Sequence, residues 1–211
     1  MDHNTYTDEL DILFNILEIY AYPRETIICI YLSGSRLYGN LTLQSDKDYT
    51  LIVKCYSGNQ NITHNTIDIS LISSFDMDKY LFEHNLQRLI NIFTPKNYIL
   101  FGNFEYEFKL DTNLLRRSVS EISNKCFHHA KVSWRDKDYY KAKKHLIHSI
   151  RYVEFGIQIM VNNKIINFAV CNDISTKIMK EESLDWNFYV NTYGKIGKTL
   201  YKEQFLKLVC L

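Results

Sequence analysis

The sequence predicts an α+β fold in which an α/β domain with a short mixed sheet is followed by a helical domain. Short apolar and β-branched runs between turn-forming residues dominate the first half of the chain, and helical spacing dominates after Asn113. The 211 residues, 46% of them hydrophobic, are enough for one domain or two small ones. We therefore expect a first domain over residues 1–108 and a helical domain over residues 109–211.

The first domain is predicted to begin with a helix and then to alternate strands with helices. Pro23 and Pro95 follow the first and last of these helices, and proline cannot continue a helix. The expected elements are a helix over residues 8–21, a strand over 25–33, a short helix over 36–40, strands over 48–54 and 65–72 separated by a turn at 57–60, and a helix over 78–93. Residues 98–108 are expected to form an edge strand or a linker.

The second domain is predicted to be all helical. Apolar residues recur there at a spacing of three or four, which is typical of helices that bury one face. The expected helices cover residues 114–131, 137–161, 172–181 and 200–211.

Charge is distributed unevenly along a chain whose formal charge is only +1. Residues 116–164 contain eleven Lys or Arg against four Asp or Glu, whereas residues 1–50 contain three against eight. The overall balance does not indicate a globally basic nucleic-acid binder. An acidic region with a basic one suits a metal site beside an anion site, and the alternative is a chance segregation of solvated charges.

The cysteines indicate a reducing compartment. The five cysteines are scattered and show neither a CxxC pair nor a zinc-ligand spacing. The sequence shows no signal peptide and no apolar run near eighteen residues. We therefore expect a cytoplasmic protein that does not associate with a membrane.

The stretch from Tyr31 to Val53 carries the residues that indicate chemistry. Gly34 and Ser35 follow a predicted strand, and Asp46 and Asp48 lie at the start of the next predicted strand. Glycine permits a positive φ or a close approach of the backbone to phosphate, and the Ser35 hydroxyl adds a hydrogen-bond donor.

Two aspartates at i and i+2 of a strand point to the same face and repel each other unless a cation lies between them. Mg²⁺ prefers carboxylate and phosphate oxygens. Asp68 alternates with apolar residues on a later predicted strand. If that strand pairs with the strand of Asp48, three carboxylates can hold two metal ions. A glycine–serine turn or an Asp-x-Asp pair alone is common in solvated turns; their combination and order are specific.

The combination resembles the DNA polymerase β-like nucleotidyltransferase superfamily, whose hallmark is a Gly–Ser turn, an Asp-x-Asp pair and a third acid. Within it the chain is most similar to the predicted nucleotidyltransferases associated with RNA repair and RNA ligases. The segments that carry the resemblance are GSRLYGNLTLQSDKDY, IDISLI, FDMDKYL, NLQRLINIFTPKNYIL and KAKKHLIHSIRYVEFGIQIMVNNKIINF. They span most of residues 28–170, and the first is the most specific.

The resemblance implies transfer of a nucleoside monophosphate from a nucleoside triphosphate to an acceptor hydroxyl, with release of pyrophosphate. It implies that Gly34, Ser35 and Arg36 bind the nucleotide, and that Asp46, Asp48 and Asp68 are catalytic and bind Mg²⁺ (or Mn²⁺), with two ions expected. Asp68 is implied to activate the acceptor. The acceptor implied is an RNA end; a protein hydroxyl, as in toxin–antitoxin relatives, and a non-catalytic nucleotide- or RNA-binding module are the alternatives.

The basic part of the helical domain offers two more candidates. On a helix, Lys144, His148 and Arg151 lie at i, i+4 and i+7 on one face, opposite an apolar stripe. We expect Lys144 and Arg151 to contact the triphosphate; the alternative is an exposed, solvated face.

Overall fold

The computed structural model describes residues 3–40, 45–54 and 59–209, with side chains from residue 8 onward. The chain divides into two compact units, one of residues 1–82 and 87–108 and the other of residues 83–86 and 109–211. Each unit is described by itself.

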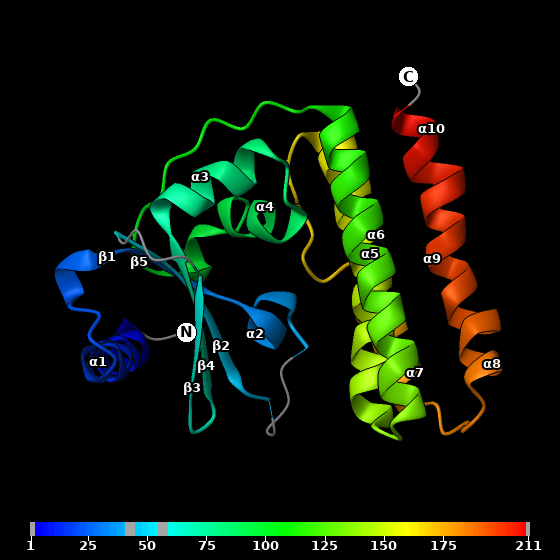
Figure 1. The fold of residues 1–211 in the computed structure, drawn as a ribbon, viewed down its shortest axis with the longest axis horizontal. Helices are drawn as coiled ribbons and strands as arrows, with labels where there is room; N and C mark the ends of the chain where they lie inside the picture. Colours follow the sequence, from blue (N-terminus) through cyan, green and yellow to red (C-terminus); the bar gives the residue numbers. More distant parts are fainter. Residues whose placement is uncertain (1–2, 41–44, 55–58, 210–211) are drawn as a thin grey trace. The chain divides into compact units, whose positions relative to one another are not determined.

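The first unit is built on a five-stranded mixed sheet with the order β3-β4-β2-β1-β5 (Figure 1). Its strands are β1 Ile27–Leu32, β2 Lys47–Val53, β3 Gln60–His64, β4 Ile67–Ser73 and β5 Ile99–Gly102. β2 and β4 run parallel, whereas β1–β2, β1–β5 and β3–β4 are antiparallel. The expected α+β class with a short mixed sheet and a helical part is confirmed.

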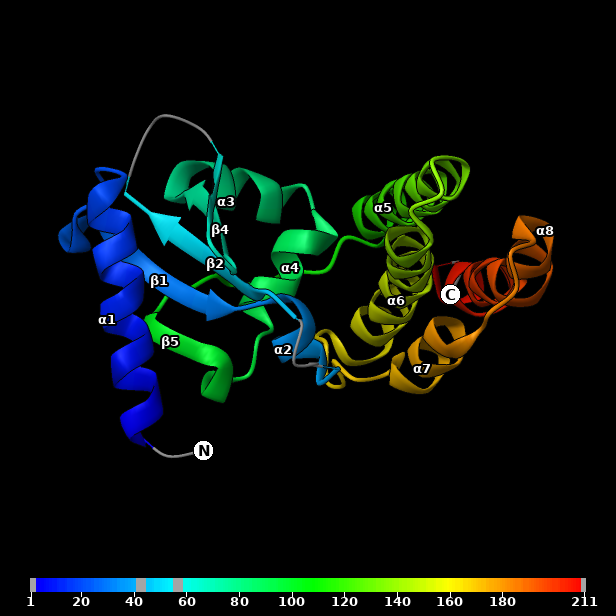
Figure 2. The ribbon, with the colours of Figure 1, turned by 90° about the horizontal axis from the view of Figure 1, so that it is seen from below.

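Helices cover both faces of this sheet. They are α1 His3–Ile19, α2 Gly34–Tyr38, α3 Ser74–Phe82 and α4 Leu86–Ile92, with 3₁₀ turns at Arg24–Thr26 and Lys96–Tyr98. The two ribbon views show α1 on one face and the pair α3 and α4 on the other (Figures 1 and 2).

A hydrophobic core of the first unit lies between α1 and the sheet. Alternate strand residues face α1, because successive side chains of a strand point to opposite faces. The strand residues of this core are Ile27, Ile30, Leu32, Tyr49, Leu51, Val53, Ile62, Ile69 and Leu71, which pack with Leu13, Phe14, Ile16 and Leu17 of α1. The residues between them in β2 and β4 therefore face away from α1.

The helix expected over residues 78–93 is broken, so that prediction was wrong in its continuity. His84 has a φ of +56°, which ends α3 before α4 begins. Its buried imidazole accepts a hydrogen bond at Nε2 from the backbone N–H of Asp111 at 2.7 Å, and the N–H of Leu86 donates to Ser118 Oγ at 2.8 Å. These tertiary hydrogen bonds satisfy groups at the break that a sequence pattern does not reveal.

The second unit is helical. Its elements are α5 Thr112–Arg135, α6 Tyr139–Asn162, α7 Asn172–Lys180, α8 Trp186–Tyr189, α9 Lys195–Thr199 and α10 Leu206–Val209, with π-helical turns at Val190–Gly194 and Leu200–Phe205. The helix expected over 200–211 therefore belongs to a longer helical run from Trp186, and its last two residues lie outside the described range. The first half of the turn expected at 57–60 lies outside it as well.

α5 and α6 form the centre of the second unit. Asp111 caps α5 by accepting from the backbone N–H groups of Asn113 and Leu114 at 2.9 and 3.0 Å. Gly156 lets the two helices approach closely, since a Cβ there would lie 2.6 Å from Val119. None of the helices in the described part of the chain combines the length and apolar character needed to cross a lipid bilayer.

Candidate functional site

The parallel pairing of β2 with β4 places two of the candidate carboxylates side by side. Asp48 and Asp68 are direct register partners. Neighbouring strands lie about 4.8 Å apart, and register partners point to the same face of the sheet. The N–H of Ser33, at the end of β1, donates to the Asp48 carbonyl at 2.9 Å and brings the Gly34–Ser35 turn to the same place.

A polar pocket of about 340 Å³ opens on this face of the sheet. It contrasts with the apolar face that packs on α1, because β2, β3 and β4 each contribute polar residues at alternate positions. The polar strand residues around it are Asp48, Thr50, Asn61, Thr63, Asp68 and Ser70, and Ser33 after β1 also lines it. No Lys or Arg is among the described residues that line it.

Gly34 is required by its contact with Asp48. Its φ is +60°, and a Cβ at this position would lie 1.8 Å from Asp48 Oδ2. The Asp48 carboxylate therefore rests against the glycine backbone, in space that any side chain would fill. This explains the glycine of the Gly–Ser turn in terms of both backbone conformation and close approach.

The Ser35 hydroxyl oxygen is buried and has no hydrogen-bond partner among the described residues. A buried polar group without a partner is costly, and in native proteins it often marks a place where a water, an ion or a ligand binds. The Ser35 hydroxyl could bind a phosphate oxygen, and the Asp48 carboxylate packed against Gly34 could bind the cation that accompanies the phosphate.

Asp46 lies immediately before β2 and is exposed. Within the described residues, the side chains of His, Cys, Asp and Glu form no group of three or more close enough to hold a metal ion. The structure thus brings Asp48 and Asp68 together by register but does not gather all three aspartates into one cage. Their oxygens are the ligand type that Mg²⁺ and Mn²⁺ prefer, and their joint binding of metal stays a prediction.

β3 adds a residue that the sequence analysis missed. Thr63 is the register partner of Asp68, and its Oγ1 donates to Asp68 Oδ1 at 2.7 Å. β3 contains a single buried apolar residue, Ile62, so its hydrophobic pattern is weak. The sequence signal for this strand is Asn65, because Asn is common in the tight turns of hairpins. In the structure Asn65 has a φ of +55° and lies in the turn between β3 and β4.

Arg36 points away from this pocket. Its Nη1 and Nη2 each donate to Glu9 Oε1 of α1 at 2.5 Å, and Nη1 donates to the Tyr49 hydroxyl at 3.2 Å. Burial acts to lower the pKa of Arg36, but Tyr49 and Glu9 outweigh it and raise that pKa. The guanidinium is thus held as a cation on the α1 face of the sheet, and its expected contact with nucleotide stays a prediction.

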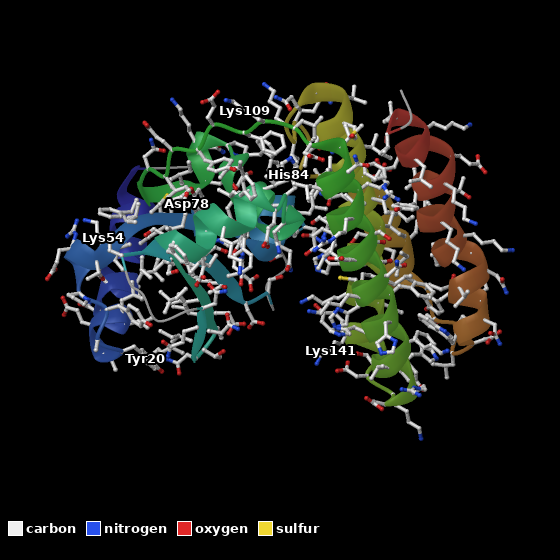
Figure 3. All side chains as sticks on the ribbon, turned by 45° about the horizontal axis from the view of Figure 1, so that its top comes forward. Tyr20, Lys54, Asp78, His84, Lys109 and Lys141 are labelled. Atoms are coloured by element: carbon white, nitrogen blue, oxygen red, sulfur yellow. The ribbon has the colours of Figure 1, made fainter. Side chains whose placement is uncertain are left out.

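The two candidates on α6 differ in exposure. Lys144 is exposed, and its ammonium lies 5.5 Å from the ring centre of Tyr140. Arg151 is only 1% exposed, and its Nη1 lies 3.4 Å from His148 Nδ1. The basic residues therefore do not form one continuous exposed stripe; the exposed ones lie near the start of the helix, as Lys141 does in Figure 3. Most of α6 from Leu146 onward is buried, which a periodicity argument with one apolar face does not anticipate.

His148 is the most strongly perturbed histidine of α6. Burial, together with the positive charges of Arg151 and Lys144 and the neighbouring His145, lowers the pKa of His148 to about 3. Burial, with His129 and two lysines nearby, also lowers the pKa of His145. Both imidazoles are therefore neutral at pH 7.

Comparisons with known proteins support the fold. No family model matches the sequence, and no curated protein matches it. Among solved structures, the chain is similar to the spectinomycin adenyltransferase AAD(9) from Enterococcus faecialis, determined with ATP and spectinomycin. The likeness covers 93% of this chain and 99% of that one, with a TM-score of 0.53 and 16% identity. It shows that the two chains share a fold.

A weaker likeness links the chain to a nucleotidyltransferase-like protein from Exiguobacterium sibiricum, with a TM-score of 0.32 and 15% identity. That match covers 93% of this chain and 72% of the other. The first comparison shows that this chain shares the fold of an adenyltransferase.

Proposed function

We propose that this protein is a metal-dependent nucleotidyltransferase that transfers a nucleoside monophosphate from a nucleoside triphosphate to an acceptor hydroxyl. The observation that carries the proposal is the register of Asp48 with Asp68, with the Gly34 backbone packed against the Asp48 carboxylate. The nucleotidyltransferase fold supports it.

In the proposed reaction the acceptor oxygen forms a bond to the α-phosphorus of the triphosphate. The bond from that phosphorus to the oxygen bridging to the β-phosphate breaks, and pyrophosphate leaves. Asp68 accepts the proton of the acceptor hydroxyl, while the Thr63 hydroxyl holds its other oxygen. Gly34 and Ser35 bind phosphate oxygens of the triphosphate.

Asp46, Asp48 and Asp68 would hold Mg²⁺ or Mn²⁺, with two ions expected. When bound, the ions supply electrostatic stabilisation of the charge that develops on the phosphate oxygens. The paired carboxylates and the buried Ser35 hydroxyl, which has no partner among the described residues, are the features that fit such a site.

For the acceptor we propose an RNA end, by the resemblance to RNA-repair nucleotidyltransferases. The eleven Lys or Arg among residues 116–164 support a polyanionic partner, because phosphate contacts dominate nucleic-acid affinity.

A small, hydroxyl-rich molecule is the second candidate acceptor. The pocket beside Asp68 is lined by carboxylates, hydroxyls and an amide, a chemistry that suits neutral or cationic polyols. The structural neighbour was determined with ATP and spectinomycin, which gives this candidate a direct precedent for the fold.

The test is to incubate the protein with each of the four NTPs, labelled at the α-phosphate, with Mg²⁺ or Mn²⁺. The acceptors are a panel of RNA ends, spectinomycin, and cellular protein. Label on RNA supports the first candidate, and label on spectinomycin supports the second. Label on protein alone contradicts both acceptor proposals, and no transfer to any acceptor contradicts the enzymatic proposal.

The expected cytoplasmic location is a separate prediction that imaging of the tagged protein tests.

A further inference from the structure

Glu9 of α1 contacts three side chains, each of which is adjacent in sequence to a proposed site residue. Arg36 directly follows Ser35, and Lys47 and Tyr49 flank Asp48. All three converge on the same carboxylate oxygen, Oε1 of Glu9. The contacts lie on the α1 face of the sheet, which is opposite the pocket that holds Asp48 and Asp68.

The cluster is mostly shielded from water. The side chains of Arg36 and Glu9 are 15% and 13% exposed, and their closest nitrogen and oxygen are 2.5 Å apart. The Tyr49 hydroxyl also donates to Glu9, and the Arg36 guanidinium lies 5.3 Å from the centre of the Tyr49 ring. Lys47 is more exposed, at 49%, and its ammonium lies 3.6 Å from Glu9. Charge-assisted hydrogen bonds in such surroundings are strong and geometrically restrictive.

Strand geometry links this cluster to the pocket. Successive residues of β2 point to opposite faces, so fixing the Tyr49 side chain on the α1 face also fixes the direction of Asp48 on the other face. α2 has only five residues, and Arg36 is its third. An Arg36 held by Glu9 therefore fixes the turn that presents Gly34 and Ser35.

We propose that Glu9 is a positioning residue that sets the Gly34–Ser35 turn relative to Asp48 from the back of the sheet. The inference rests on the proposed nucleotidyl transfer. Catalysis of this kind depends on placing reacting groups within a fraction of an ångström, so a small shift of the turn lowers the rate more than it lowers substrate binding.

The experiment compares Glu9→Gln with Ile16→Val, a core substitution on the same helix that leaves every hydrogen-bonding group of the cluster in place. Both variants are tested well below their midpoints of thermal unfolding. For Glu9→Gln we expect kcat to fall at least tenfold, with the KM for the NTP changed less than threefold. For Ile16→Val we expect a kcat within twofold of the original protein.

A second readout does not depend on activity. In ¹H–¹⁵N spectra, Glu9→Gln is expected to shift the amide signals of Gly34, Ser35 and Asp48 more than Ile16→Val does. If Glu9→Gln does not fold, Tyr49→Phe removes one hydroxyl of the cluster and is expected to shift the same signals, with a twofold to fivefold loss of kcat.

The outcomes separate the two proposals. An active original protein with an unchanged kcat and unchanged amide signals in the Glu9→Gln variant overturns the positioning role. Equal losses in Glu9→Gln and Ile16→Val also overturn it, since they reflect general destabilisation. An original protein that transfers to no acceptor overturns the proposed function, and the amide signals still decide whether Glu9 holds the turn.

Discussion

At the scale of single residues, the site depends on a close contact between a glycine and a carboxylate. Gly34 combines a positive φ with space that Asp48 already fills, so its role is set by two independent constraints. The sequence alone indicated a glycine–serine turn, but it did not reveal that the Asp48 carboxylate packs against the α-carbon of Gly34.

Gly34→Ala tests this contact. The new methyl group would have to displace the Asp48 carboxylate, and the positive φ adds strain, so we expect a loss of about 1–3 kcal/mol in stability and loss of nucleotidyl transfer. The matched control is Gly39→Asn, because Gly39 is exposed with a φ of +70° that Asn tolerates. Calorimetry and the transfer assay check both; equal effects of the two substitutions would argue against the contact.

Thr63 is expected to hold the Asp68 carboxylate in its working orientation. Thr63→Val keeps the shape but removes the donor to Asp68 Oδ1, so we expect kcat to fall about threefold to tenfold. Thr63→Ser keeps the hydroxyl and is expected to retain most of the activity. Steady-state kinetics on the two variants decide the matter, and a Thr63→Val enzyme as active as Thr63→Ser would contradict this role.

At the scale of elements, the sequence anticipated most helices and strands but not the contacts that interrupt or extend them. β1, β2 and β4 follow apolar runs, and their positions were predicted to within a few residues. β3 was missed because its stability comes from pairing with β4 and not from its own apolar content. The sequence did not reveal that Arg36 bonds to Glu9 of α1 or that Arg151 is buried, because periodicity does not specify partners. Their contact with a nucleotide stays a prediction.

The break between α3 and α4 gives a stability prediction. His84→Ala removes the acceptor for the Asp111 N–H and leaves space in a buried position, so we expect the free energy of unfolding to fall by about 1–3 kcal/mol. His128→Ala, at an exposed position of α5, is the control and should change it by less than about 0.5 kcal/mol. Urea titrations measure both. Equal, small changes would show that the break does not depend on His84.

α6 is expected to make stability sensitive to acid. The pKa of His148 is about 3 in the folded chain and about 6.5 when unfolded, so below pH 6.5 the unfolded chain binds the extra proton. Stability is therefore full above about pH 6.5 and falls toward pH 3, with a loss of about 2 kcal/mol at most by pH 5. His148→Gln should flatten this part of the pH profile in urea titrations; an unchanged profile would assign the acid sensitivity to other groups.

At the scale of the whole molecule, the sequence predicted the α+β fold and led to the proposed class of chemistry, but it left the acceptor open. The order of a glycine–serine turn, an aspartate pair and a third aspartate is a local signal that can be read directly from the sequence. Acceptor recognition depends on pocket shape and on side chains contributed by several elements, and a fold hosts many substrates.

Salt dependence separates the two acceptor candidates. An RNA end bound through phosphate contacts should lose affinity steeply as salt rises, with a slope that grows with the number of contacts. A small polyol in the pocket beside Asp68 should respond far less. The KM for each acceptor, measured at several salt concentrations, makes the comparison. A flat response for RNA would argue against phosphate recognition by the basic residues.

One assay decides whether the paired aspartates on β2 and β4 perform nucleotidyl transfer. The original protein, Asp48→Asn and Asp68→Asn are compared for transfer of α-phosphate label, with Asp78→Asn, an exposed carboxylate of α3 labelled in Figure 3, as the control. We expect both site variants to lose at least about 100-fold in rate while remaining folded, and Asp78→Asn to retain its activity. An unchanged rate of transfer in Asp48→Asn or Asp68→Asn would contradict the catalytic role of these two aspartates.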